Sequence, residues 1–160
     1  MAVEMEQVKA ALDAEEPDYP GAVKSLGADA LPHLERIITG DHTGLAAKAA
    51  YLAGLIGTDK CLPAMNKAAS SGQAVVRLAA AAAAQYMPDE YRDSLVLQLV
   101  DDADAGVQKV AMRSAPAMAV MSDALKSRVM ALGKTAGKAP AVKRTVKKAA
   151  KKVVAKPKKP

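Results

Sequence analysis

Two stretches of this chain match each other without a gap at a spacing of 31 residues. The first covers residues 30–56 and the second covers residues 61–87. Corresponding positions hold similar apolar residues, as in the pairs Leu31–Leu62, Leu34–Met65, Leu45–Val76, Ala49–Ala80 and Ile56–Met87. A fainter third copy keeps the same register at Val96, Val107 and Ala111. Self-similarity at a fixed period predicts a repeat array, in which each unit buries its apolar face against its neighbours.

The composition indicates that the repeated units are helical. About half of the residues are apolar, four are Tyr, and Phe and Trp are absent. Ala and Leu lead the helix scale, whereas a strand-rich core needs more β-branched and aromatic residues. No apolar run reaches the roughly 18 residues of a membrane span. We therefore expect an all-α, intracellular protein, placed in the cytoplasm or nucleoid, or in the nucleus if the cell has one.

Turn and cap residues divide the chain into expected helices. The first covers residues 3–14, and a short second one begins after Asp18 and stops at Gly27. We expect Asp29 to cap the third helix, because Asp is a favoured N-cap and Pro32 fits the first turn. Further helices are expected to end at Gly40, Gly57, Ser70, Tyr86 and Val100, then to restart at Val107, and the last to run from Ser122–Asp123 to Gly133.

Charge divides the chain into two parts. Residues 1–133 hold 12 Lys and Arg against 17 Asp and Glu, a net charge of −5. Residues 134–160 hold 11 Lys and Arg and no acid, a net charge of +11. We expect residues 1–133 to form a helical repeat domain with units at about 30–60, 61–91 and 92–122 between flanking cap helices. Residues 134–160 form a separate basic tail, and such charge asymmetry indicates a polyanionic partner.

The helix pairs resemble HEAT repeats of the short bacterial kind. The resemblance is carried by an early proline in the first helix, by an acidic turn, and by Val76-Arg77-Leu78-Ala79-Ala80 in a second helix. The third unit keeps the acidic turn and Val107 but has Gln108 where Arg77 stands one unit earlier. The resemblance covers roughly residues 27–121. It implies an α-solenoid of antiparallel helix pairs, with the second helices lining a concave face.

The same resemblance implies where a partner would bind. Cations on the second helices are candidates for a basic stripe on the concave face: Lys48, Arg77, Lys109 and Arg113. A structural alternative exists for Arg77, because in this family an arginine after valine often bonds an acid of a neighbouring repeat. Asp41 or an acid of the third turn, residues 101–106, would be its partner. For the other three cations, the alternative is an ordinary solvated surface.

The basic tail resembles the Lys/Ala/Pro-rich C-terminal tails of linker histones and of some bacterial nucleoid proteins. Its charge density and lack of aromatic residues predict disorder in isolation, although valines at helical spacing leave open a helix that forms on binding. Lysines placed along a duplex displace counterions whatever the base sequence. We expect sequence-independent binding of DNA, in preference to RNA, by Lys134, Lys138, Lys143, Arg144, Lys147, Lys148, Lys151, Lys152, Lys156, Lys158 and Lys159.

No constellation for catalysis, metal binding or a cofactor is found in the sequence. His33 and His42 lack metal-ligand spacing, and Cys61 has no partner cysteine. We therefore expect a non-enzymatic protein whose body is a scaffold for an unidentified protein partner. The alternative is an adaptor that binds a partner on its repeat face, while the tail serves only solubility or localisation. A membrane surface fits poorly, because the tail lacks the Trp, Phe or Leu that anchor interfacial helices.

Overall fold

The computed structural model describes residues 2–136, and these residues are helical with no strand. The helices are α1 (Met5–Asp13), α2 (Tyr19–Leu26), α3 (Leu31–Ile38), α4 (Thr43–Ile56), α5 (Leu62–Ala69), α6 (Ala74–Ala83), α7 (Asp89–Leu99), α8 (Ala105–Ser114) and α9 (Asp123–Ala136). Three short 3₁₀ turns join them, η1 (Gly27–Ala30), η2 (Asp59–Cys61) and η3 (Ala84–Tyr86). The expected all-α class is confirmed for this part of the chain.

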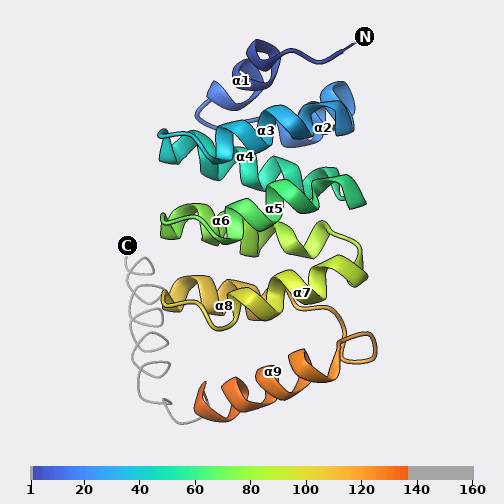
Figure 1. The fold of residues 1–160 in the computed structure, drawn as a ribbon, viewed down its shortest axis with the longest axis vertical. Coiled ribbons are helices and arrows are strands. Elements are labelled where there is room, and N and C mark those ends of the chain that lie inside the picture. The colour runs from blue at the N-terminus through green and yellow to red at the C-terminus, as the bar shows by residue number, and fades with distance from the viewer. Residues whose placement is uncertain (1, 137–160) are drawn as a thin grey trace, which may run out of the picture. The chain divides into compact units, whose positions relative to one another are not determined.

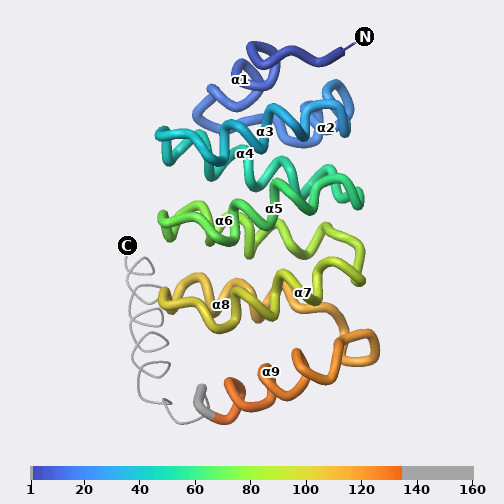
Figure 2. Tube along the Cα trace, viewed as in Figure 1, coloured from blue at the N-terminus to red at the C-terminus, as the bar shows by residue number. Residues whose placement is uncertain are grey.

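The chain divides into two compact units after Lys126. In the first unit, consecutive helices pair as α3 with α4, α5 with α6 and α7 with α8, joined by short turns (Figure 1). The first helices of the pairs, α3, α5 and α7, pack against one another in order, and so do the second helices, α4, α6 and α8. Figure 2 shows the chain alternating between these two layers. The described part of the second unit is the end of α9.

The 31-residue register predicted from the sequence reappears in the helix boundaries and in the core. The second helices α4, α6 and α8 begin at Thr43, Ala74 and Ala105, which are 31 residues apart. Corresponding positions are fully buried in all three pairs, namely Leu34, Met65 and Val96 on the first helices and Ala49, Ala80 and Ala111 on the second. The stripe of small residues lets neighbouring second helices approach closely, because alanine adds only one carbon beyond the backbone.

Local sequence explains several helix ends. The Asp104 carboxylate caps α8 by accepting from the backbone N–H groups of Gly106 and Val107, at 2.8 and 3.0 Å. The Ser122 hydroxyl likewise accepts from the backbone N–H of Leu125 at the start of α9. Gly57 ends α4 in the left-handed region at φ +64°, a conformation that glycine adopts without steric cost.

Several expected boundaries differ from the structure. Helix α1 begins at Met5 and not at residue 3, and α6 ends at Ala83, with η3 covering the residues up to Tyr86. Asp29 does not cap α3, because it lies inside η1 and the helix follows directly from that turn. Helix α8 begins at Ala105, two residues before Val107, since the Asp104 cap starts it earlier. Gly133 does not end the last helix, because α9 continues to Ala136 and a single glycine costs a helix only about 1 kcal/mol. Helix α8 stops at Ser114, because Pro116 disfavours the helical conformation of the residue before it, Ala115, which has extended dihedral angles.

Within the described residues, no helix combines the length and the apolar character that crossing a membrane requires. The predicted division into residues 1–133 and 134–160, with repeat units at 30–60, 61–91 and 92–122, stays a prediction.

Candidate functional site

The four cations predicted to form a basic stripe lie on the second-helix layer, but their surroundings differ. Lys48 is on α4, Arg77 on α6, and Lys109 and Arg113 on α8. The first two are bonded within the fold, and the last two are exposed. The stripe therefore separates into two structural cations and two surface cations.

Arg77 joins α6 to the turn that precedes α8. Its guanidinium donates to both carboxylate oxygens of Asp102, at 2.7 and 3.0 Å, and its third bond goes to the carbonyl oxygen of Ser71 at 2.8 Å. The side chains of Arg77 and Asp102 are only 17% and 8% exposed. This bidentate bond lowers the pKa of Asp102. The structure thus pairs Arg77 with an acid of the third turn and not with Asp41.

Gln108 repeats part of this arrangement one unit later. Its side-chain amide donates to the carbonyl oxygen of Asp102 at 2.6 Å, as Arg77 donates to that of Ser71. In each case the donor stands six residues after its acceptor. The two donors are 31 residues apart, and so are the two acceptors. Gln108 therefore keeps the hydrogen bond to the preceding turn. Because its amide is uncharged, it cannot form an ion pair with the next unit as Arg77 does.

Lys48 holds the end of α1. Its ammonium group donates to the carbonyl oxygens of Leu12, at 3.2 Å, and Ala14, at 2.6 Å. The last carbonyls of a helix have no partner inside the helix and carry partial negative charge, which a cation stabilises. Lys48 therefore has a structural contact that its position in the sequence does not reveal.

Lys109 and Arg113 lie one turn apart on α8 and are exposed. Within residues 2–136, neither forms an ion pair. They are the two members of the predicted stripe whose charges are available to a partner.

Of the eleven cations predicted to bind nucleic acid, the described structure includes one. Lys134 is exposed in the last turn of α9. The other ten candidate cations lie outside the described residues: Lys138, Lys143, Arg144, Lys147, Lys148, Lys151, Lys152, Lys156, Lys158 and Lys159.

Three of the four tyrosines form a row across the helices, which the sequence did not reveal. The ring of Tyr19 on α2 lies 4.9 Å from that of Tyr51 on α4, which lies 6.2 Å from that of Tyr86 in η3, both pairs edge to face. The hydroxyls of Tyr51 and Tyr86 are 3.4 Å apart. This contact, followed by burial, raises the pKa of Tyr51 to about 12. The three tyrosines are 32 and 35 residues apart in the sequence. Because these spacings differ from the 31-residue repeat, the repeat does not predict that the rings meet.

The histidines and the cysteine have structural surroundings. One ring nitrogen of His33, Nε2, donates to the carbonyl oxygen of Val3 at 2.7 Å, and Nδ1 of His42 accepts from the backbone N–H of Leu45. Cys61 is buried, and burial raises the pKa of its thiol to about 11. Such a thiol is a poor nucleophile at neutral pH. Among residues 2–136, no group of His, Cys, Asp and Glu could hold a metal ion.

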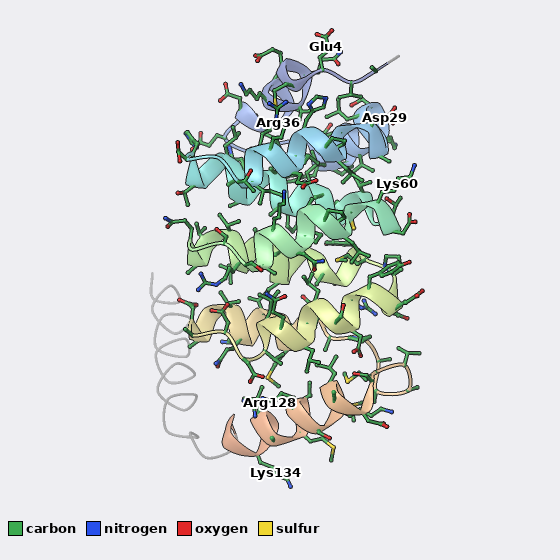
Figure 3. The ribbon with its side chains drawn as sticks, in the orientation of Figure 1. Glu4, Asp29, Arg36, Lys60, Arg128 and Lys134 are labelled. Atoms are coloured by element: carbon green, nitrogen blue, oxygen red, sulfur yellow. The ribbon has the colours of Figure 1, made fainter. Side chains whose placement is uncertain are left out.

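An open hollow of about 710 Å³ lies beside His33, between the N-terminal segment, η1 and the start of α5. Asp29 and Lys60 lie on its border, near the same edge of the unit (Figure 3). Glu35, which also lines it, is paired with Lys67 at 2.5 Å. The hollow is therefore bordered by side chains of both charges.

Comparison of the chain with models of known protein families, with curated proteins and with solved structures gives no match. Any function must therefore be inferred from the residues themselves.

Proposed function

We propose that the protein binds nucleic acid without sequence preference through the cations of residues 134–160, with the helical body as a scaffold. The observation that carries the proposal is the charge division, −5 in residues 1–133 and +11 in residues 134–160. DNA is the favoured ligand. The proposed body is an α-solenoid of HEAT-like helix pairs, supported by the two packed layers, the 31-residue register and the bond from Arg77 to the next unit.

The proposed mechanism is electrostatic. Each lysine that contacts a phosphate releases condensed counterions, which favours binding regardless of base sequence. Base readout in the major groove needs side chains such as Arg or Asn held against base edges, whereas residues 134–160 hold ten lysines, a single arginine and no asparagine. The acidic body repels the duplex, so the tail is expected to hold the body at a distance from the phosphates. We propose no enzymatic step.

The test is a gel-shift comparison of three full-length proteins on a duplex of arbitrary sequence. In the first variant, Lys147, Lys148, Lys151 and Lys152 become Gln, which removes four tail charges. The matched control replaces Lys9, Lys24, Lys60 and Lys126 with Gln, which removes four body charges. We expect the tail variant to bind at least about tenfold more weakly than the wild type, and the control to bind as the wild type does. Equal weakening by both variants would contradict the proposal.

A second candidate function is that of a protein adaptor. It is favoured by the exposed apolar side chains of Val75 and Tyr86 on the second-helix layer, which are 47% and 45% exposed. If the protein is an adaptor, all three proteins of the gel-shift comparison, the wild type, the tail variant and the control, would bind DNA weakly or not at all.

A further inference from the structure

The solvent-facing side of the second-helix layer is apolar over two of its three helices. Because the helices share one register, corresponding positions can be compared directly. The apolar strip consists of exposed and half-buried side chains: Ala47, Tyr51 and Leu55 on α4 and Val75, Leu78, Ala82 and Tyr86 on α6 and η3. The positions that correspond to Leu78 and Ala82 on α8 are Lys109 and Arg113, which we call the basic edge.

The first-helix layer shows the opposite character at its exposed positions. There the exposed residues of α3, α5 and α7 include charged and amide side chains: Arg36, Asn66, Lys67, Glu90 and Gln98. Since α3, α5 and α7 keep their exposed side polar, the uncharged surface of α6 is not a general consequence of an alanine-rich composition. We therefore take this face as a candidate binding surface.

A cluster of carboxylates lies at the other side of the apolar strip. Asp13, Glu15, Glu16 and Asp18 are exposed around the link between α1 and α2, and we call them the acidic edge. Two contacts fix this link beside α4, the bonds from Lys48 to the carbonyls of Leu12 and Ala14 and the contact between the rings of Tyr19 and Tyr51. Even with Lys48 nearby, the acidic edge keeps a net negative charge.

The order across the face is therefore the acidic edge, α4, α6 and the basic edge, because α6 packs between α4 and α8. Such a face is complementary to itself. A twofold axis that passes through the apolar strip between α4 and α6 places the basic edge of one copy against the acidic edge of the other, twice. The isologous interface of a symmetric dimer has this property.

We infer that the apolar strip is a dimer interface, covered by the same face of a second copy of this chain. The strip excludes water from its centre, and the two edges fix the direction in which the copies meet. Nucleic acid fits the face less well, because the strip carries no cation for phosphates. In addition, Tyr51 and Tyr86 meet edge to face instead of presenting two parallel rings to bases.

The experiment is sedimentation velocity of the full-length protein over a micromolar concentration range, without nucleic acid. The wild type is expected to show a concentration-dependent monomer–dimer equilibrium. Reversal of the basic edge (K109E with R113E) and reversal of the acidic edge (D13K with E15K and E16K, which takes that edge from −4 to +2 and keeps Asp18 as the cap of α2) are each expected to raise the dimer dissociation constant by about a hundredfold or more, because like charges then face each other.

Mixing the two reversed proteins is the sharpest part of the experiment. One protein then has two acidic edges and the other has two basic edges, so a heterodimer is expected to form with about the wild-type dissociation constant. The matched control is R36E with K60E, which makes the same change in net charge away from the strip and is expected to dimerise as the wild type does. The exposed Val75→Glu variant is expected to be monomeric with unchanged helicity by circular dichroism.

Several results would overturn the inference. These are a wild type that stays monomeric throughout the range, reversed proteins that dimerise as the wild type does, or a mixture that forms no heterodimer. Loss of DNA binding by V75E with the dimer intact would assign the face to nucleic acid and also overturn it. The gel-shift test of the tail is independent of these results.

Discussion

Arg77 is the residue whose surroundings most clearly join one helix pair to the next. It forms an ion pair with Asp102 and bonds the Ser71 carbonyl, so one guanidinium meets two successive turns. Both charged side chains are largely buried, which raises the cost of leaving either one alone. This arginine therefore joins one helix pair to the next.

Replacing Arg77 with Met keeps most of the side-chain volume and leaves the Asp102 carboxylate without its partner. We expect the free energy of unfolding to fall by about 2 to 3 kcal/mol, measured by urea denaturation at neutral pH. The matched control is Arg36→Met on the exposed side of α3, for which a change within about 0.5 kcal/mol is expected.

The pH dependence of this destabilisation follows from the lowered pKa of Asp102. A carboxyl whose pKa is depressed in the folded state stabilises the fold above its unfolded pKa, near 3.9, and no longer does so once the pH falls through the folded value. The stability difference between the wild type and R77M should therefore be full at neutral pH and shrink below about pH 4. A difference that is unchanged in acid would contradict the assignment.

The Tyr51 hydroxyl gives a second test at a single side chain. Its contact with Tyr86 raises its pKa to about 12 from the ordinary value of 10.0. In Tyr86→Phe, we expect the tyrosinate absorbance of Tyr51 to appear at lower pH, because the hydrogen bond is removed. Since a raised folded pKa stabilises the protonated fold, the wild type should lose more stability than Y86F as the pH rises above about 10. Identical titration curves for Tyr51 in the two proteins would show that the contact is absent in solution.

Helices α4 and α6 approach each other closely at Gly54. A Cβ atom on Gly54 would lie 2.4 Å from the Cβ of Ala83 and 3.0 Å from its carbonyl oxygen. Backbone atoms cannot move aside as a flexible side chain can, so glycine is required here by the packing and not by its backbone dihedral angles. This contact links the second helices of two neighbouring pairs.

We predict that Gly54→Ala destabilises the protein by about 2 kcal/mol in urea denaturation, although alanine is the better helix former. Gly44, in the first turn of the same helix, provides the matched control. A Cβ there would meet only the His42 ring, at 3.7 Å, an ordinary contact. Gly44→Ala should therefore stabilise the protein by up to about 1 kcal/mol. Stabilisation by both substitutions would show that α4 and α6 do not approach this closely.

The sequence predicted the helices better than the contacts between them. The register of Leu34, Met65 and Val96 could be found because a buried helix face repeats with the helix period. For Arg77, the sequence indicates an acidic partner in a neighbouring unit but does not say which acid. The partner depends on which turns lie next to each other in the fold. The Lys48 contact with the end of α1 was not foreseen, since a carbonyl acceptor has no sequence pattern. Asp29 is a residue type that often caps a helix, and it was therefore expected to cap α3. It does not, because it lies within η1, which continues directly into α3.

For the molecule as a whole, we propose different tasks for the two parts: the acidic helical body as a scaffold, and the basic segment as the part that binds polyanions. If the body dimerises through the apolar strip, each assembly carries two basic segments. Linked binding segments gain affinity through their high effective concentration near the same duplex. The K109E/R113E variant should then bind DNA more weakly than the R36E/K60E control at protein concentrations where the wild type is dimeric, as measured by fluorescence anisotropy.

Phosphate binding by the basic segment is best tested by the salt dependence of DNA affinity, measured for the full-length protein by fluorescence anisotropy on a duplex of arbitrary sequence. If about six cations contact phosphates, log affinity should fall with log salt at a slope of roughly −5, or about thirtyfold for each doubling of salt concentration. Replacing Lys147, Lys148, Lys151 and Lys152 with Gln should make the slope shallower by about one for each of these lysines that binds a phosphate in the wild type. A slope near zero, or the same slope in both proteins, would show that these lysines do not bind the phosphate backbone.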